Sequence, residues 1–404
     1  MTAATTGPLA GIDVLELPGP YAEYTGKLFA DLGARVTLVE PPAGAAARGR
    51  PPFLDDRAGP ERSLWFGYFN AGKRSVVLDL DDPDGVTRFR ELVAEADVLL
   101  DGTGHPRLMA DRELGPAQLR SLNPRLVHTV VTPFGTDGPY ADWEATDLVL
   151  MALGGLLSLG GYADGQPTRA YGDQACLAAA QFAAIGTMLA VLEAEETGAG
   201  QLVDVSAQES VVMAHENAVP YYDLEGVVRT RNGGTPRQAA VGVYPCSDGH
   251  VYLLAKGLGV FWPQLVGWLE EEGVEGASGL REDKWQDDTF AAGEEGKAEF
   301  QAVFERFSMQ QTKEELYRQA KAHRLPLCPV YTPADLVANP QLAARGYFVD
   351  VHHEATGRTL RMPGLPYQLS ATPGRTQSGA PRLGEHGGGS LAEPVEATTA
   401  GAPR

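Results

Sequence analysis

The stretch GIDVLELPGPYAEYTGKLFADLGARVTLVEPP, residues 11–42, decides the fold. Its apolar runs at 12–17 and 36–40 are typical of buried strands, and the segment 21–32 is typical of a helix that ends at Gly33. Two short strands joined through a helix predict a parallel pair with a right-handed crossover. The chain therefore begins with a βαβ unit.

The same alternation continues further along the chain. Apolar runs predict strands, and amphipathic or Ala-rich segments predict the helices between them. The strands are expected at 74–80, 97–100, 126–131 and 202–205, and the helices at 84–96, 116–122, 173–197 and 207–217. Such alternation predicts an open parallel sheet of the α/β class, which binds ligands at the carboxyl ends of its strands.

The length of the chain and a change in the pattern of predicted elements indicate the domain organisation. A chain of 404 residues usually forms more than one domain. Near Gly226 the parallel pattern gives way to a hairpin, turned by Ser247-Asp248-Gly249, and then to charge-rich helices. We expect a small α+β domain at 225–325 and, because of its low complexity, a flexible tail at 386–404.

Composition argues against several kinds of partner. The formal net charge of −20 repels nucleic-acid backbones and anionic membranes. No stretch is expected to reach the ~18–20 uninterrupted apolar residues of a membrane span. The N-terminus, MTAATTGPLAG, lacks the pattern of a secretory signal. Three scattered cysteines, Cys176, Cys246 and Cys328, indicate reduced thiols, so we expect a cytoplasmic protein.

Nucleotide and metal cofactors are not expected. LPGPYAEYTG, residues 17–26, lacks the G-x-G-x-x-G that lets a pyrophosphate approach the backbone, so an NAD-dependent oxidoreductase is disfavoured. GYFNAGKR, residues 67–74, resembles a phosphate loop, but Arg74 takes the position of the Mg²⁺-binding hydroxyl. Lys73 and Arg74 remain either solvated surface or an anion anchor. The eight histidines fit no metal motif.

Asp173 opens a long Ala-rich helix, YGDQACLAAAQFAAIGTMLAVLEAE, residues 171–195. Aspartate is a favoured N-cap, and capping is the commoner role at such a position. Alternatively, the N–H groups and dipole of the helix keep the carboxylate ionised, and an ionised carboxylate is a nucleophile. The residues alone leave both roles open. An apolar stripe is expected to pack this helix on the sheet through Leu177, Ile185, Met188 and Leu192.

Several segments in a fixed order resemble the class III CoA-transferase family, also called the CaiB/BaiF or formyl-CoA transferase family. They include LAGIDVLEL (9–17), FADLGARVTLVEPP (29–42), FNAGKRSVVLDLDDPDG (69–85), FGTDGPYADWEATDLVLMALGG (134–155), the Asp173 helix and GAGQLVDVSAQESV (198–211). The similarity runs from Leu9 to about Glu385. It implies a large Rossmann-like domain built from 1–224 and 326–385, the small domain between them, and an interlocked homodimer.

The resemblance also implies an activity. CoA would move from an acyl-CoA donor to a free carboxylic acid, with Asp173 as the nucleophile and with aspartyl anhydride and aspartyl-CoA thioester intermediates. CoA thioesters are then substrates, and no permanent cofactor is implied. The matching CoA-binding positions are Leu78, Asp101, Gly102, Thr103 and Arg112. To these we add Lys73, Arg74 and Arg107, because the phosphates of CoA need cations.

The acyl group has its own expected residues. The resemblance implies that Tyr21 and Asp147 face it, and the loop at Gly160 and Gly161 is a candidate for holding the oxyanion. The chain departs from the family pattern in the first turn, which reads Pro-Tyr-Ala-Glu (20–23), and in the loop 101–107.

Two alternatives remain. A 2-methylacyl-CoA racemase of the same fold would pair the aspartate with a histidine, but Thr146 stands at that position. A threonine hydroxyl cannot exchange protons reversibly near neutral pH. A protein that binds CoA esters without turnover is the second alternative, and the altered loop 101–107 favours it.

Overall fold

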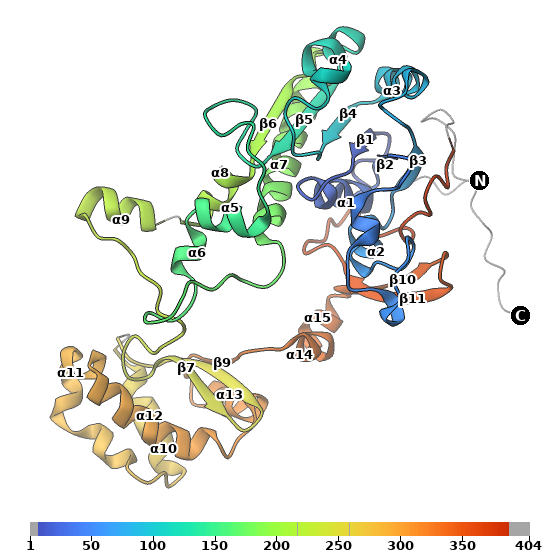
Figure 1. Cartoon of the computed structure of the whole chain (residues 1–404). Coiled ribbons are helices and arrows are strands. Elements are labelled where there is room, and N and C mark those ends of the chain that lie inside the picture. The colour runs from blue at the N-terminus through green and yellow to red at the C-terminus, as the bar shows by residue number, and fades with distance from the viewer. Residues whose placement is uncertain (1–6, 216, 258, 388–404) are drawn as a thin grey trace, which may run out of the picture. The chain divides into compact units, whose positions relative to one another are not determined.

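The computed structural model describes residues 7–387 except 216 and 258, and it divides the chain into two compact units (Figure 1). The large unit comprises residues 1–157, 170–226 and 341–404, and the small unit comprises 158–169 and 227–340. The expected boundaries at 225 and 325 therefore shift. The segments 158–169 and 326–340 belong to the small unit, and most of the expected tail, 388–404, lies outside the described residues.

A six-stranded sheet organises the large unit. Its strand order is β3-β2-β1-β4-β5-β6, and every neighbouring pair is parallel. The strands are β1 Asp13–Leu17, β2 Arg35–Glu40, β3 Arg74–Val77, β4 Val98–Asp101, β5 Val127–Thr132 and β6 Leu202–Ser206. The order reverses direction between β1 and β4, which is the switch point at which doubly wound sheets bind ligands. The structure confirms the predicted α/β class.

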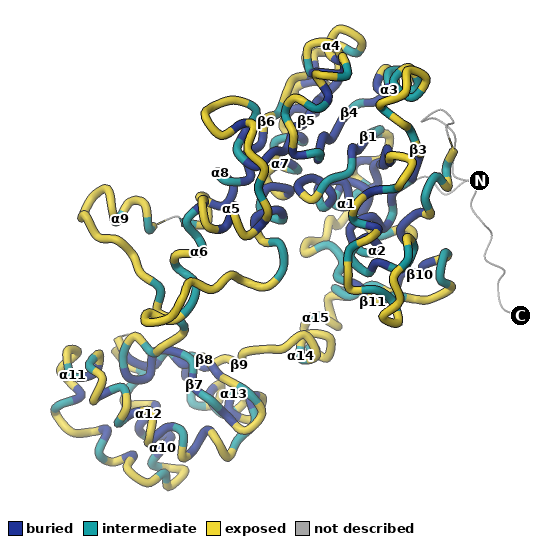
Figure 2. Tube along the Cα trace, viewed as in Figure 1, coloured by how far each residue is buried: buried dark blue, intermediate teal, exposed yellow. Residues whose placement is uncertain are grey.

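Helices cover both faces of this sheet, so its central strands are buried (Figure 2). Phe89 and Leu92 of α3 pack on one face, and Phe29 of α1 and Ala190 of α7 pack on the other. The helices of the large unit are α1 Glu23–Asp31, α2 Leu64–Phe69, α3 Pro83–Glu95, α4 Pro116–Leu122, α5 Asp147–Leu153, α7 Gln174–Thr197, α8 Ala207–Val212, α9 Ala218–Glu225 and α15 Pro340–Ala344, with α6 Leu156–Leu159 at the junction.

The turns that leave β1 and β4 touch at the switch point. A Cβ atom on Gly19 would lie 1.7 Å from the carbonyl oxygen of Gly102, and one on Gly102 would lie 2.8 Å from the Cβ of Ala22. No side chain fits at either position. Glycine is therefore required at both places for the two turns to pack together.

α7 packs on the sheet mainly through small residues, and Met188 is the member of the expected stripe that contacts the same core. Ala179, Ala183 and Ala190 are buried, whereas Ile185 and Leu192 are each 57% exposed. Small side chains let the helix approach α1 and β5 closely, which large aliphatic side chains would prevent. Several larger residues consequently face outward. Those exposed along this helix are Phe182, Ile185, Leu189 and Leu192.

The same helix bears on the expectation that no stretch of the chain reaches the apolar length of a membrane span. α7 is long and apolar enough to cross a membrane by length and composition, with a mean hydropathy of 2.0. Within its most apolar window, 44% of the residues are buried against the rest of the protein. The helix is thus partly a core helix of the large unit, with one apolar face left open.

The small unit has its own core and an antiparallel sheet in the order β7-β8-β9. Trp268, Trp285 and Phe300 lie at the centre of that core. Strands and helices of this unit are β7 Val241–Cys246, β8 Gly249–Leu254, β9 Leu327–Pro329, α10 Phe261–Glu271, α11 Asp288–Ala292, α12 Glu294–Ser308, α13 Lys313–Ala322 and α14 Pro333–Ala338. The predicted hairpin is β7-β8, and β9 adds a third strand beside β8.

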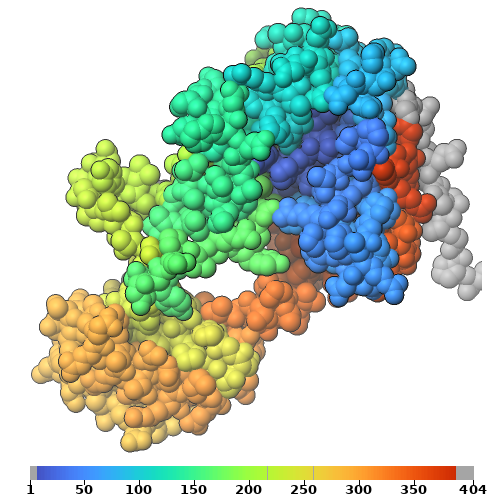
Figure 3. All heavy atoms as spheres, in the orientation of Figure 1, coloured from blue at the N-terminus to red at the C-terminus, as the bar shows by residue number. Residues whose placement is uncertain are grey.

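The C-terminal segment belongs to the large unit and lies against its N-terminal part (Figure 3). It carries the antiparallel hairpin of β10 Phe348–His353 and β11 Arg358–Pro363. Arg375 N–H donates to the carbonyl of Asp31, and the Arg48 guanidinium donates to the carbonyl of Pro381. Both ends of the chain therefore build this unit.

Candidate active site

The carboxyl edge of the sheet gathers residues from several elements. Asp173 precedes α7, and a helix that returns to the amino edge of a parallel sheet begins at the carboxyl edge. Asp147 is the first residue of α5, which follows β5. Tyr21 follows β1 and Arg50 follows β2. These four residues all lie in the large unit, so one rigid scaffold carries them.

The N-terminus of α7 is capped by Asp147 and not by Asp173. One oxygen of Asp147, Oδ1, accepts hydrogen bonds from the backbone N–H groups of Ala175, at 2.7 Å, and Cys176, at 3.2 Å. Asp173 occupies the N-cap position, but its side chain makes no capping hydrogen bond. The structure thus separates the two roles that the sequence left open, because a different carboxylate satisfies the exposed N–H groups.

The carboxylate of Asp173 pairs with Arg50. The Nη2 atom of Arg50 lies 2.5 Å from Oδ2 of Asp173, and the two side chains are 33% and 15% exposed. The pair therefore sits at the surface of a partly buried site and not in the core. A partly exposed carboxylate at this place can be reached by a ligand.

Arg50 is mounted on a rigid segment. Its guanidinium carbon lies 3.5 Å from the ring centroid of Trp65, and its carbonyl accepts a hydrogen bond from Ser63 at 2.6 Å. Two residues earlier, Arg48 binds both oxygens of the buried Glu40 at 2.7 Å. A stacked guanidinium on a fixed backbone keeps its direction, so Arg50 is preorganised beside Asp173.

The neighbouring titratable groups are neutral or already bonded. Burial, followed by the charges of Asp147 and Asp173, raises the pKa of the Cys176 thiol, so this cysteine is not a nucleophile. Burial also raises the pKa of Tyr21, whose hydroxyl donates to the carbonyl of Ala145 at 2.6 Å. Burial likewise raises the pKa of Glu23, which accepts from Trp65 Nε1. Asp173 is therefore the best candidate nucleophile among these groups.

Some expected CoA-binding residues lie at the carboxyl ends of their strands. Leu78 follows β3, and Asp101 ends β4 and is followed by Gly102 and Thr103. Asp101 is buried, and its Oδ1 accepts from the backbone N–H and the hydroxyl of Thr103. Burial raises the pKa of Asp101, and the Thr103 hydrogen bonds oppose this effect. The turn after β4 is thereby fixed next to the switch point.

Lys73 is not available to a phosphate, which corrects one expectation. Its ammonium lies 2.7 Å from Oε1 of Glu16 in a pair whose side chains are both 0% exposed, and it also donates to Asn70 and to the carbonyl of Glu23. An ammonium held this way stabilises the core. Arg74, the first residue of β3, is only partly exposed.

Two of the expected cations are engaged in ion pairs, and Arg107 is the more exposed of the two. Arg107 is 74% exposed and pairs with Asp142 at 2.9 Å, and Arg112 pairs with Asp81 at 2.6 Å. Exposed pairs of this kind are weak and exchange partners easily. The Arg107 side chain can therefore turn to an anionic ligand at little cost, whereas Arg112 is 24% exposed and is also held by the carbonyl of Leu108.

Gly160 and Gly161 belong to the small unit, whereas Asp173 belongs to the large unit. The carbonyl of Gly160 accepts from Thr168 N–H, and Gly161 has a φ of +104° that favours glycine.

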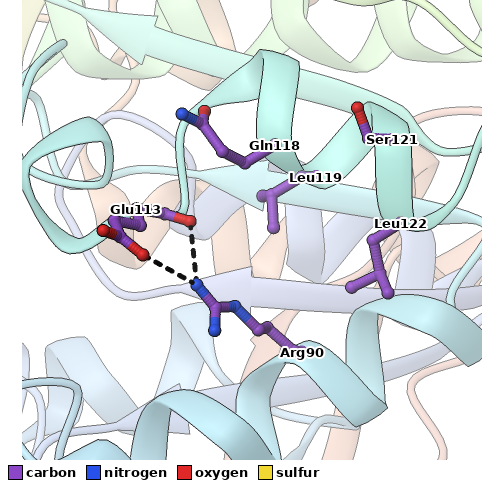
Figure 4. A pocket seen from close by; sticks show the side chains of 6 residues that line it. All are labelled: Arg90, Glu113, Gln118, Leu119, Ser121 and Leu122. Carbon is purple, nitrogen blue, oxygen red and sulfur yellow. Dashed lines mark hydrogen bonds and ion pairs between the residues drawn. The ribbon is translucent and has the colours of Figure 1, made fainter.

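A surface hollow of about 490 Å³ lies on α3 and α4 (Figure 4). None of the expected site residues lines it. Its lining consists of Arg90, Glu113, Gln118, Leu119, Ser121 and Leu122.

Sequence reasoning missed Arg50 and Trp65. Neither belongs to a motif, and Arg50 lies in the Ala/Gly/Pro-rich loop after β2. A basic residue in a long loop after a strand of such a sheet was the only available signal.

Within residues 7–387, apart from 216 and 258, no group of three or more His, Cys, Asp or Glu side chains could hold a metal ion.

Fold and site together define a Rossmann-like α/β protein with a candidate carboxylate nucleophile at the carboxyl edge of its sheet. The chain belongs to CoA-transferase family III, whose family model matches residues 9–387. This match confirms the resemblance drawn from the sequence segments. Membership of this family supports a transferase activity, and CoA thioesters are consistent with it as substrates.

Individual relatives agree with the family assignment. The succinyl-CoA:(R)-benzylsuccinate CoA-transferase subunit BbsE of Thauera aromatica is 38% identical over 378 residues, covering 92% of this chain and 91% of that protein. The succinyl-CoA–D-citramalate CoA-transferase of Chloroflexus aurantiacus is 31% identical over 387 residues, covering 94% and 92%. The crystal structure of a CaiB/BaiF family protein from Brucella suis superimposes with a TM-score of 0.83 at 27% identity, covering 94% and 97%.

Proposed function

We propose that this protein is a CaiB/BaiF-type CoA-transferase that moves CoA from an acyl-CoA donor to a free carboxylic acid, with Asp173 as the nucleophile. The observation that carries this proposal is that two different aspartates serve the start of α7. Asp147 caps the helix, so the lone pairs of Asp173 are not consumed by backbone N–H groups. Its carboxylate is instead held at the edge of the site by Arg50.

The proposed reaction proceeds through two kinds of covalent intermediate on Asp173, mixed anhydrides and an aspartyl-CoA thioester. Its carboxylate attacks the thioester carbonyl of the donor, and CoA thiolate leaves, which forms a mixed anhydride. The thiolate then attacks the aspartyl carbonyl, and the donor acid leaves. The resulting aspartyl-CoA thioester reacts with the second acid through the same two steps in reverse. Covalent catalysis in this form divides one difficult exchange into easier acyl transfers.

CoA is proposed to lie along the carboxyl ends of β3 and β4. Leu78 and the turn 101–103 would contact it, and Arg112 and Arg107 would pair with its phosphates by exchanging their present partners. Arg74 remains a proposed cation for the same group. Lys73 is not included, because its ammonium is buried against Glu16.

Dicarboxylic acids are the proposed substrate class, and succinyl-CoA is the proposed donor. Two relatives that align with more than nine-tenths of this chain carry succinyl-CoA in their names, together with (R)-benzylsuccinate and D-citramalate. A site with a guanidinium beside the nucleophile fits anionic acids. The Tyr21 and Asp147 positions are proposed to border the acyl group.

A cytoplasmic homodimer is proposed as the working form. The open face of α7 supports a partner, because Ile185, Leu189 and Leu192 are more than half exposed on a helix whose other face is buried. A second copy would cover this face without a membrane. Light scattering after gel filtration in the absence of detergent tests this, and a monomer or a detergent-dependent species would contradict it.

The decisive experiment traps the intermediate. We expect that succinyl-CoA followed by hydroxylamine or borohydride modifies a peptide containing Asp173, and that Asp173→Ala abolishes both the modification and the turnover while the protein stays folded. Turnover at the native rate in that variant would overturn the proposal. Circular dichroism before and after substitution serves as the control for folding.

Two further measurements separate the alternatives. A racemase would wash deuterium into C2 of a 2-methylacyl-CoA, and we expect no such exchange because Thr146, the N-cap residue of α5, offers no second proton carrier. A protein that only binds CoA esters would gain thermal stability with acyl-CoA but would show no change of protein mass. Rapid exchange, or binding without a mass change, would contradict the transferase proposal.

A further inference from the structure

Arg50 has hydrogen-bonding capacity that its contact with Asp173 does not use. A guanidinium carries five N–H donors in a planar fork. Among the described residues, one of these donors is engaged, from Nη2 to Oδ2 of Asp173. One face of the guanidinium lies on Trp65, and the side chain is 33% exposed. The free edge of the fork is therefore open to a second oxygen ligand.

The charge of Arg50 persists while the charge of its partner does not. A guanidinium stays protonated in proteins. The proposed reaction, on which this inference rests, converts the Asp173 carboxylate into a neutral anhydride and then a neutral thioester. Each time, an anion appears elsewhere: first the CoA thiolate, then the carboxylate of the released acid. Arg50 would otherwise stand beside neutral acyl groups without a counter-ion, half-buried, which is unfavourable.

We propose that Arg50 binds the reacting carboxylate of the acid substrate while Asp173 is the CoA thioester. Arg50 exchanges its ion pair with Asp173 for an ion pair with the acid, and it returns to Asp173 when the cycle closes. Its stacking on Trp65 fixes the plane of the fork, so the bound carboxylate is presented to the aspartyl carbonyl. Arg50 is thus a binding and positioning residue for the acid, and it does not transfer protons.

The step that this contact assists is balanced without a proton. An oxygen of the bound carboxylate attacks the carbonyl carbon of the aspartyl thioester, the C–S bond breaks, and the CoA thiolate leaves with the bonding electron pair. The thiolate then attacks the carbonyl carbon of the acid in the anhydride. That C–O bond breaks, and the Asp173 carboxylate leaves with the electron pair. The reacting groups carry one negative charge at every stage of this step, first on the acid carboxylate, then on the CoA thiolate and finally on Asp173.

The test separates loading of the enzyme from discharge by the acid. Full-length protein is loaded with succinyl-CoA, the CoA adduct is measured by intact mass, and its decay is followed against the concentration of succinate or of butyrate. Butyrate has the same four-carbon chain with one carboxylate. The variants are Arg50→Lys, Arg50→Gln and Arg50→Gly, with Arg57→Gln as a matched control on an exposed arginine of the following segment.

For Arg50→Gln we expect the adduct still to form, with a change in the KM for succinyl-CoA below about threefold, while the acid concentration for half-maximal discharge rises about tenfold or more, the usual cost of a lost charge-assisted contact. The rise should be equal for succinate and butyrate, smaller for Arg50→Lys and absent for Arg57→Gln. Guanidinium ion at low concentration should partly restore discharge in Arg50→Gly.

Three results would overturn the inference. An unchanged acid dependence in Arg50→Gln would show that the acid does not bind there. A loss confined to succinate would place the remote carboxylate on Arg50 instead of the reacting one. A uniform loss that guanidinium does not repair would indicate a structural role. If the wild-type protein forms no adduct with succinyl-CoA, the proposed function fails first and this inference falls with it.

Discussion

Removing the Asp147 carboxylate should destabilise the start of α7, whereas removing the Asp173 carboxylate should not. In Asp147→Ala, the N–H groups of Ala175 and Cys176 lose their shared acceptor while their residues stay buried. A lost N-cap costs about 0.5–2 kcal/mol. A charged acceptor makes hydrogen bonds roughly twice as strong as a neutral one.

These terms give an expected loss of about 2–3 kcal/mol in the free energy of unfolding. For a domain of this size, that corresponds to a melting temperature lower by roughly 4–12 °C. The assay is urea unfolding followed by circular dichroism and tryptophan fluorescence. Turnover should fall as well, because the start of α7 positions Asp173.

Two companion variants make the result interpretable. Asp147→Asn keeps an acceptor of similar capping strength and loses only the charge at the helix start, so it should cost about 0.3–1 kcal/mol. Asp173→Ala should cost less than about 1 kcal/mol, because it breaks a partly exposed ion pair and no cap. The reasoning is refuted if Asp147→Ala unfolds like the wild type, or if Asp173→Ala loses as much as Asp147→Ala.

Burial lowers the pKa of His128 from 6.5 to about 4, so the folded state binds fewer protons than the unfolded state between these values. The contribution of His128 to the free energy of unfolding should fall by about 3 kcal/mol as the pH drops through this window, and His128→Leu should remove that contribution from the pH dependence measured in urea titrations. Paired substitution of Ile185 and Leu189 by Asp should convert a dimer to a monomer in light scattering. Lys73→Met should cost about 3–5 kcal/mol in urea unfolding by leaving the buried Glu16 carboxyl without its partner, and adding Glu16→Leu should recover much of it. An undiminished pH slope, an intact dimer or a mild Lys73 variant would each contradict its prediction.

The order of elements was predictable because each element carries a local signal. The strands β1, β2 and β4 are short apolar runs, and their connecting helices end at glycine or at a change of polarity. The boundaries were less predictable, since β3 stops at Val77 although the apolar alternation continues to Leu80. Pairing over long distances left no local signal. β9 joins β8 across more than seventy positions, and the segment 158–169 belongs to a unit that is otherwise formed by 227–340.

The orientation of α7 shows why an apolar pattern alone was insufficient. This helix is apolar on nearly every side, so periodicity gave no reliable phase. The prediction placed Ile185 and Leu192 on an apolar stripe that faces the core. The sheet selects instead the face on which Ala179 and Ala183 allow close approach. The large residues on the other side form an open apolar face, which a second copy of the chain is proposed to cover.

The site depends on contacts that the sequence order hides. Asp147 and the residues it caps are 28 and 29 positions apart, and Arg50 and Asp173 are 123 apart. An aspartate at a helix start can cap or react, and these roles compete for the same lone pairs. A second carboxylate on α5 removes the competition, and an arginine on the loop after β2 supplies the counter-charge. A covalent role for Asp173 thus requires no loss of helix stability during the reaction, since the group that becomes acylated is not the group that holds the helix.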